Sequence, residues 1–335
     1  MTKIKTKNSL IHIFLTKMTK KLLKDFKELH KSVLLCELVN SIEISKTKKN
    51  IIVDCTLWMG GHAREILKKL HKWDIFIWFD VDKRNLDIVK FELEKEFKWS
   101  WIELKFVNDN FLNLKKNLES LKIEKITWIY YDLGISSLHV DEAERWFSFK
   151  LDGPLDMRFD TSSRITAKEI VNSYSKDDLI KIFKEYGEEP SSRKIAEEII
   201  LEREKWTMFK TTKELSDLIW RVSKFPKAKN RIFQALRIET NRELEVIEKS
   251  VRDGIDLLEK GGNIFVISFH SLEDRIIKNI FKNEARDCIC GEIICVCKHK
   301  KSLKILTKKP LLPTSDEIKS NPRSRSAKAR CAKKI

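Results

Sequence analysis

Residues 50–82 read NIIVDCTLWMGGHAREILKKLHKWDIFIWFDVD, and this stretch decides the fold. The run from Ile51 to Thr56 has the length and β-branched content of a buried strand, and a second such run spans Ile75 to Asp82. Between them, a glycine pair precedes apolar residues at helical spacing. A strand, a helix and a second strand form the unit of parallel sheets, whose ligands lie at the carboxyl ends of the strands. The stretch therefore predicts an α/β fold with a site at that edge.

The same alternation continues outward from this unit. We expect a helix over 83–97, strands with their trailing loops over 102–111, 126–134 and 263–270, and a long helix from Phe233 toward Glu259 that Gly261 and Gly262 end. Residues 142–232 show helical periodicity without an evident strand, which predicts an inserted helical domain. The predicted division is a basic N-terminal extension over 1–29, a discontinuous core over 30–141 and 233–335, and the helical insertion over 142–232.

Composition limits the classes of protein to which the chain can belong. It has 335 residues, 42% of them hydrophobic, which excludes wholesale disorder. There is no run of about 18 apolar residues, so we expect no membrane span. Seven cysteines, an odd number, indicate reduced thiols and a cytoplasmic protein. The net charge of +17 favours a phosphate-rich partner such as nucleic acid, although general lysine richness would give the same figure.

Four features at the predicted strand ends suit an adenosine-containing cofactor. Gly60 and Gly61 form a turn open to close approach, Asp80 can accept ribose hydroxyls, Phe111 can stack on adenine, and Asp132 ends a strand. Each also has an ordinary structural reading: a turn, a surface carboxylate, a core aromatic and a helix N-cap. Together they describe an S-adenosylmethionine site of the class I methyltransferase type. NAD is disfavoured because no G-x-G-x-x-G follows the first strand.

Longer motifs strengthen this interpretation. The segments HKSVLL, MGGHA, FDVD, DLGISS, DGPLDMR, YGEE, FQALRIETN, VISFHSLEDRIIK and NPRSRSAKAR lie between His30 and Arg330. With them the chain resembles the 16S ribosomal RNA (cytosine-N4)-methyltransferase family, often called RsmH or MraW. The resemblance implies a Rossmann-like, mostly parallel class I S-adenosylmethionine-dependent fold with a helical insertion. It also implies methyl transfer to N4 of a cytidine in the decoding region of 16S rRNA.

The resemblance also implies site residues and partners. By matched position, the cofactor residues are Gly60, Gly61, His62, Asp80, Phe111, Asp132 and His139, the last where the family commonly has Gln. For catalysis we select Asp132, Ser136 and Ser137 as a polar rim for the cytosine amino group, and His270 as a contact to the base or its phosphate. Arg158, Arg237 and Arg275 either bind RNA phosphates or hold internal carboxylates. The expected partner is 16S rRNA or the small ribosomal subunit, and the sequence leaves monomer and homodimer open. The alternative function is a non-catalytic rRNA-binding assembly factor with the same fold.

Tryptophan stands at several positions where this family usually has glycine. The chain has 9 residues of each type, and Trp58, Trp78, Trp128 and Trp146 occupy such positions. One interpretation is divergence with loss of activity, because an indole in the loop at Trp58 would obstruct the cofactor. The interpretation we prefer is that UGA codons translated here as Trp encode Gly in the source organism.

A cysteine cluster lies outside these motifs. Cys288, Cys290, Cys295 and Cys297 form C-x-C-x4-C-x-C, and four thiolates can close a tetrahedral zinc site. The C-x-C steps are tighter than the usual C-x2-C, so we favour thiols in a loop and assign no metal.

Overall fold

The computed structural model describes residues 31–134, 152–160, 163–205, 208–290, 292 and 296–335. Seven strands form one sheet in the order β3-β2-β1-β4-β5-β7-β6. They are β1 Ile51–Asp54, β2 Ile75–Phe79, β3 Glu103–Val107, β4 Ile126–Asp132, β5 Leu258–Ser268, β6 Leu303–Ile305 and β7 Lys328–Lys334. The first five pair in parallel, and β7 is antiparallel to both of its neighbours. This topology confirms the predicted class I methyltransferase fold.

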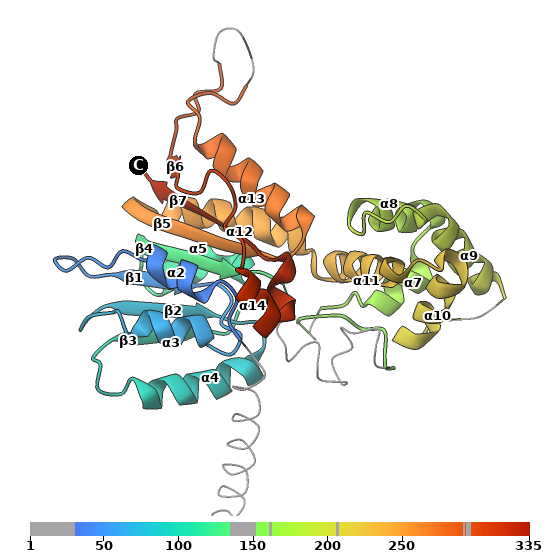
Figure 1. The fold of residues 1–335 in the computed structure, drawn as a ribbon, viewed down its shortest axis with the longest axis horizontal. Helices are drawn as coiled ribbons and strands as arrows, with labels where there is room; N and C mark the ends of the chain where they lie inside the picture. The colour runs from blue at the N-terminus through green and yellow to red at the C-terminus, as the bar shows by residue number, and fades with distance from the viewer. Residues whose placement is uncertain (1–30, 135–151, 161–162, 206–207, 291, 293–295) are drawn as a thin grey trace, which may run out of the picture.

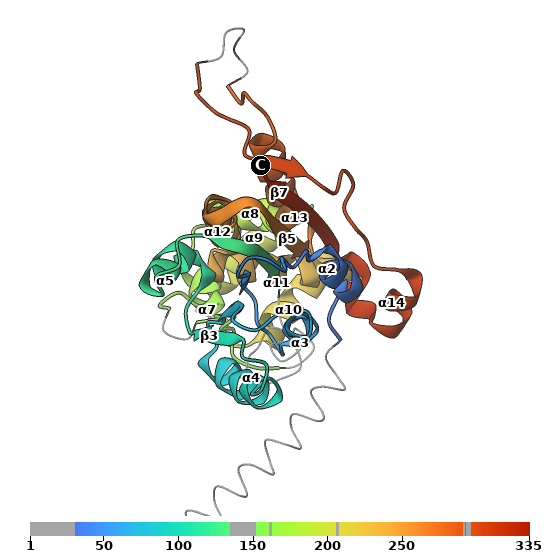
Figure 2. The same cartoon turned by 90° about the vertical axis from the view of Figure 1, so that its left-hand side faces the viewer.

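Helices cover both faces of the sheet (Figures 1 and 2). One face packs against α2 Leu35–Ser41, α3 Gly61–Leu67 and α4 Lys83–Glu96. The other packs against α5 Leu114–Ser120, α12 Glu243–Leu257 and α13 Ser271–Glu284. Because both faces are covered, the central strands are apolar throughout rather than alternating, which is why they are recognisable in the sequence.

A second group of helices lies beyond one edge of this layered body (Figure 1). It comprises α7 Ala167–Ser173, α8 Lys176–Glu185, α9 Ser192–Glu204, α10 Thr212–Ser223 and α11 Pro226–Asn241. These helices surround their own hydrophobic core, to which Phe233 and Leu236 of α11 contribute. The division into domains stays a proposal, and this packing favours placing most of α11 with the helical part.

Two details differ from the sequence-based expectations. The helix expected from Phe233 to Glu259 is two helices, because the chain breaks at Arg242, whose φ of 49° is left-handed. Gly261 and Gly262 lie inside β5, at the register shift between β4 and β5, and end no helix.

The basic C-terminal segment is a strand of the sheet. β7 pairs with β5 along six residues, from Asn263 opposite Lys333 to Ser268 opposite Lys328. Arg330 donates to both oxygens of Asp274 on α13, at 2.6 and 3.1 Å. The two remaining short helices, α14 Ser315–Ser320 and η3 Pro322–Ser326, bring the chain back beside the start of α2 (Figures 1 and 2). None of the described helices is both long enough and apolar enough to cross a membrane.

Candidate active site

A cleft opens at the carboxyl edge of the parallel strands, which is where ligands bind in open α/β sheets. The loops after β1, β2, β3 and β4 line it together with the first turns of α12 and α13. The lining residues that matter most are Thr56, Trp58, Asp80, Phe111, Glu243 and Glu273.

Asp80 follows β2 directly, and the loop around it fixes its carboxylate. One oxygen accepts the backbone N–H of Asp82 at 2.9 Å, and the other accepts the side-chain amide of Asn85. The amide of Asn108 donates to the Asp80 carbonyl at 2.9 Å. The carboxylate is therefore held in place at the cleft wall, as the sequence predicts.

Phe111 begins the short helix η1 Phe111–Asn113 after β3. Its ring lines the cleft and meets Tyr131 edge-on, with ring centroids 5.8 Å apart. Asn110 caps η1, because its side-chain oxygen accepts the N–H of Leu112 at 2.8 Å. The ring is thus set on a capped turn across the cleft from β2.

Trp58 lies in the turn between β1 and α3 and also lines the cleft. Its φ is 45°, in the left-handed region that side chains disfavour. The indole Nε1 donates to the carbonyl of Asp132 at 2.8 Å. The Trp58 carbonyl accepts the amide of Asn85 at 2.7 Å, so this turn is tied to the Asp80 loop.

Gly60, Gly61 and His62 follow this turn and begin α3. Gly60 caps α3 with φ 68°, and a Cβ on Gly61 would lie 2.1 Å from the hydroxyl of Ser32. His62 is buried, with Nε2 2.9 Å from the Val33 carbonyl and Nδ1 3.5 Å from a carboxylate oxygen of Asp132. None of the three is among the cleft-lining residues, so their assignment to the cofactor stays a prediction.

Two buried acids end β1 and β4. Burial raises the pKa of Asp54 to about 7, with the nearby Asp80 charge adding to it and hydrogen bonds from Tyr130 and Thr56 opposing it. Burial, with the charges of Asp54 and Glu273, holds the pKa of Asp132 well above its ordinary value. One oxygen of Asp132 is buried without a hydrogen-bond partner among the described residues. A buried acceptor with no partner costs about 1–3 kcal/mol, so this atom is suited to meet a ligand.

Two acidic side chains, those of Glu243 and Glu273, line the cleft at the starts of α12 and α13. Glu243 receives two hydrogen bonds from the buried Arg237, at 2.8 and 3.0 Å. The backbone N–H groups of Phe269 and His270 donate to Glu273 at 2.7 and 3.2 Å. Although burial alone would raise the pKa of Glu273, the charge and hydrogen bond of His270 lower it. Both carboxylates therefore face the cleft in fixed positions.

Asn241, the last residue of the motif FQALRIETN, connects the start of α12 to the segment containing DGPLDMR. The Asn241 side chain accepts the N–H of Phe159 and donates to the carbonyl of Met157, both at 2.8 Å. Phe159 and Asn241 both line the cleft. The two motifs thus meet at one wall.

Comparison with known proteins agrees with this architecture. A model of the MraW methylase family matches residues 27–335. The chain belongs to the MraW methylase family. Its relatives include the Ribosomal RNA small subunit methyltransferase H of Clostridioides difficile (strain 630), which is 44% identical over 314 residues, covering 91% of this chain and 99% of the relative. The protein of the same name from Caldicellulosiruptor saccharolyticus is 47% identical over 291 residues, covering 85% of this chain and 93% of the relative. That of Halothermothrix orenii is 42% identical over 315 residues, covering 91% and 98%.

Membership of the MraW methylase family confirms the predicted resemblance. The predicted site residues differ in whether they line the cleft. Asp80 and Phe111 line the cleft, and Asp132 ends β4 beside the lining residues Leu133 and Gly134. His270 caps α13, with Nε2 3.2 Å from Glu273, and is not among the lining residues. The positions that lie outside the described residues are Ser136, Ser137, His139 and Trp146.

Each of the three arginines with two alternatives pairs with a carboxylate of the protein, and the pair formed by Arg275 is exposed. Arg158 binds both oxygens of Asp156, Arg237 binds Glu243, and Arg275 donates to Glu188 at 2.9 Å.

Sequence reasoning missed Glu243, Glu273 and Asn241, all of which line the cleft. FQALRIETN and SFHSLEDR contain Asn241 and Glu273, and Glu243 follows the first motif by two residues. The motifs were therefore the available signal, although acidic residues in the first turn of a helix also have an ordinary electrostatic role.

Proposed function

We propose that this chain transfers the methyl group of S-adenosylmethionine to the exocyclic N4 of a cytidine in the decoding region of 16S ribosomal RNA. The supporting observation is one cleft lined by Asp80 and Phe111 and by the two buttressed carboxylates of Glu243 and Glu273. Relatives 44% and 47% identical are named as small-subunit ribosomal RNA methyltransferases. An RNA substrate implies that the enzyme acts in the cytoplasm.

The residues that follow β2, β3 and β4 suit the cofactor. S-adenosylmethionine supplies an electrophilic methyl group on a sulfonium sulfur. We assign Asp80 to the ribose hydroxyls, because its carboxylate is fixed at the cleft wall at the carboxyl end of β2. Phe111 offers an aromatic face for the adenine, and the unpaired buried oxygen of Asp132 is an acceptor for a polar ligand group.

The two carboxylates at the starts of α12 and α13 suit the amino group of a cytosine. A base must leave its stack to reach a cleft at the edge of a sheet, and its N4 then offers two hydrogens. We assign Glu243 and Glu273, which both line the cleft, as the acceptors for these two hydrogens. Hydrogen bonds to those hydrogens raise the electron density on nitrogen as the new bond forms, which favours transfer in line with the methyl group.

Two further residues position these acceptors. Arg237 holds Glu243 through two hydrogen bonds, and His270 lies 3.2 Å from Glu273. We therefore assign His270 to positioning Glu273 rather than to contact with the base. Ser136 and Ser137 stay proposals from the family resemblance.

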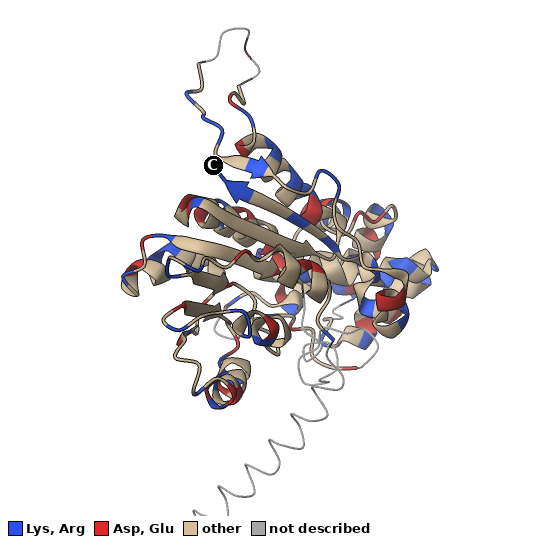
Figure 3. Ribbon diagram, turned by 60° about the vertical axis from the view of Figure 1, so that its left-hand side comes forward, with Lys and Arg blue, Asp and Glu red and all other residues tan. Residues whose placement is uncertain are grey.

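The charge distribution supports an RNA partner. Figure 3 shows basic and acidic residues mixed along many helices, whereas β7 is mainly basic. The segment 298–309, which leads through β6 at the edge of the sheet, has six lysines and no acidic residue. Exposed lysines without paired acids are suited to phosphate contacts, which position an RNA without reading its sequence.

Methyl transfer to small-subunit RNA tests the proposal, with modified nucleosides identified by mass spectrometry. N4-methylcytidine should form, and Glu243→Gln should slow its formation by about 10–100-fold, the value of one charge-assisted hydrogen bond. Glu248→Gln is the matched control, because Glu248 is on the same helix but its side chain is 51% exposed and pairs with Arg252. RNA binding without any methylated cytidine would instead establish the non-catalytic alternative.

A further inference from the structure

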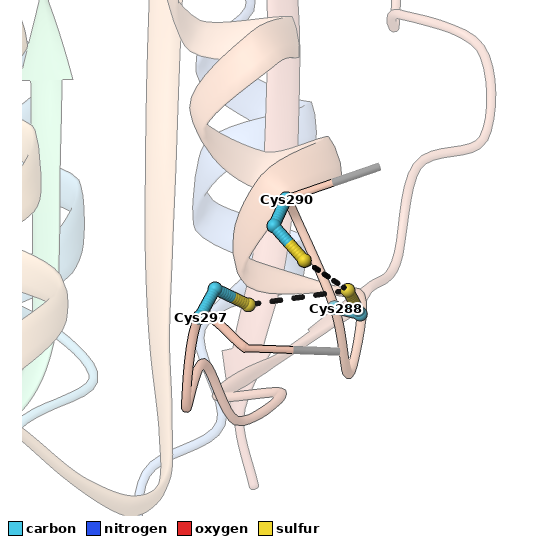
Figure 4. A group of neighbouring side chains, drawn as sticks. All are labelled: Cys288, Cys290 and Cys297. Atoms are coloured by element: carbon cyan, nitrogen blue, oxygen red, sulfur yellow. Dashed lines mark hydrogen bonds between the residues drawn. The ribbon is translucent and has the colours of Figure 1, made fainter. Parts of the chain in front are cut away.

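A cluster of sulfur atoms lies between α13 and β6, away from the cleft. Cys288, Cys290 and Cys297 turn their side chains toward one another (Figure 4). The Cys288 sulfur is 3.2 Å from that of Cys290 and 3.9 Å from that of Cys297, and all three lie within 4.8 Å of one another. None of the described residues between 286 and 301 lines the cleft, so methyl transfer does not account for this convergence.

We propose that these three cysteines bind a zinc ion as thiolates. Zinc–sulfur bonds of about 2.3 Å at tetrahedral angles place the sulfurs about 3.8 Å apart. The observed separations of 3.2 and 3.9 Å are close to that spacing, and far longer than the roughly 2.05 Å of a disulfide. Three sulfurs around one point are a donor set that soft divalent metals prefer.

The surroundings of these thiols differ from those of ordinary buried cysteines. Cys55 and Cys331 are buried, and burial raises the pKa of Cys331 to about 12. The three thiols of the cluster are instead partly exposed, so an ion can reach them from solvent.

The described apolar side chains of the loop are not packed in a core. Ile289 is 48% exposed and Val296 is 70% exposed. Cys288 and Cys290 lie on the outgoing arm and Cys297 on the returning arm (Figure 4). One ion bound by both arms would hold them together. Zinc commonly has this role in segments that bury too few side chains to form a core.

The proposal rests on the three described cysteines. Cys295 belongs to the same sequence motif but lies outside the described residues. Three thiolates leave the fourth tetrahedral position of the ion to a water molecule.

Metal analysis of the reduced full-length protein tests this proposal. We expect about one zinc per chain, and, after zinc is removed, cobalt should restore the intense absorption of a tetrahedral thiolate complex. Cys288→Ser, Cys290→Ser and Cys297→Ser should each weaken zinc binding at least 100-fold against a chromophoric chelator. Cys36→Ser is the matched control, because Cys36 is an exposed cysteine on α2.

The same samples distinguish a lost site from a lost fold. Because the loop is exposed and distant from the sheet core, the variants should retain the circular dichroism of the parent and its affinity for S-adenosylmethionine. Wild-type protein with fully titratable thiols that takes up neither zinc nor cobalt would overturn the proposal. Zinc retained equally by the cysteine variants and the parent would also overturn it.

Discussion

Replacing Trp58 by glycine tests whether this residue obstructs the cofactor end of the cleft. Trp58 has φ 45°, and a left-handed conformation costs a residue with a side chain about 1–2 kcal/mol. Glycine removes that cost, whereas the indole hydrogen bond to the Asp132 carbonyl, worth about 0.5–1.5 kcal/mol, is lost. These terms nearly cancel, so the free energy of unfolding of Trp58→Gly should stay within about 1 kcal/mol of the parent.

The affinity for S-adenosylmethionine should change more. The indole shares the cleft wall with Thr56 and Asp80, where the proposed cofactor end lies. A ligand that displaces it must break the Asp132 hydrogen bond and expose part of the ring, together about 2 kcal/mol. Without the indole, binding should therefore tighten by about 10–30-fold, measured by titration calorimetry.

Two companion variants separate the side chain from the backbone. Trp58→Ala removes the indole but keeps a β-carbon at positive φ, so it should gain the affinity while being less stable than Trp58→Gly. Trp73→Gly relieves φ 76° at a residue that is 62% exposed and lines no part of the cleft, so it should leave affinity unchanged. Equal affinities for the parent and for folded Trp58→Gly would refute the reasoning.

Three further predictions concern the acids and the basic strand. Asp80→Asn should weaken S-adenosylmethionine binding by about 1.5–3 kcal/mol per charge-assisted hydrogen bond, and unchanged calorimetric affinity would remove Asp80 from the site. The folded-state pKa of Asp54, about 7, exceeds its ordinary 3.8, so its contribution to stability is complete below about pH 4 and is lost as the pH rises through 7. Asp54→Asn should therefore flatten the pH dependence of denaturant unfolding by up to roughly 4 kcal/mol between pH 4 and 8, and an unchanged profile would contradict the shifted pKa. Arg330→Met should cost roughly 3 kcal/mol in urea unfolding, because the mostly buried carboxylate of Asp274 then keeps only Lys328, 3.9 Å away, as its partner, whereas Arg252→Met at an exposed pair should cost less than about 1 kcal/mol.

The central sheet was predictable because its signal is local. Runs such as IFIWF are continuously apolar, and a strand covered on both faces needs that composition. The last strand was not predictable in this way. KARCAKK has four basic residues and three small ones, and it resembles a flexible basic tail until β5 and Asp274 supply its partners.

The residues proposed for the cofactor were likewise easier to predict than those proposed for the base. Asp80 follows its strand in the sequence, so topology alone places it at the edge of the sheet. Glu243 and Glu273 instead start two helices and reach the cleft only because α12 and α13 pack side by side. The break at Arg242 that sets the direction of α12 has no glycine or proline to mark it.

Five of the described tryptophans fall into two groups with different physical problems. Trp58, Trp73 and Trp101 have positive φ, which is rare for a bulky residue. Trp78 and Trp128 are buried in β2 and β4, and their indole N–H groups have no hydrogen-bond partner among the described residues.

Glycine would resolve both problems, since it accepts a positive φ and has no side-chain donor to bury. A buried donor without a partner costs about 1–3 kcal/mol, and a left-handed tryptophan adds about 1–2 more. One change in the meaning of UGA would thus remove several unfavourable terms at once, whereas divergence would require each to be tolerated separately. The opposing consideration is that Trp78 stacks between Phe76 and Phe106, with ring centroids 4.3 and 4.6 Å away, so glycine there requires these rings to repack. Peptide mass spectrometry of the native protein therefore decides most directly at position 58, where glycine improves the backbone without emptying a core.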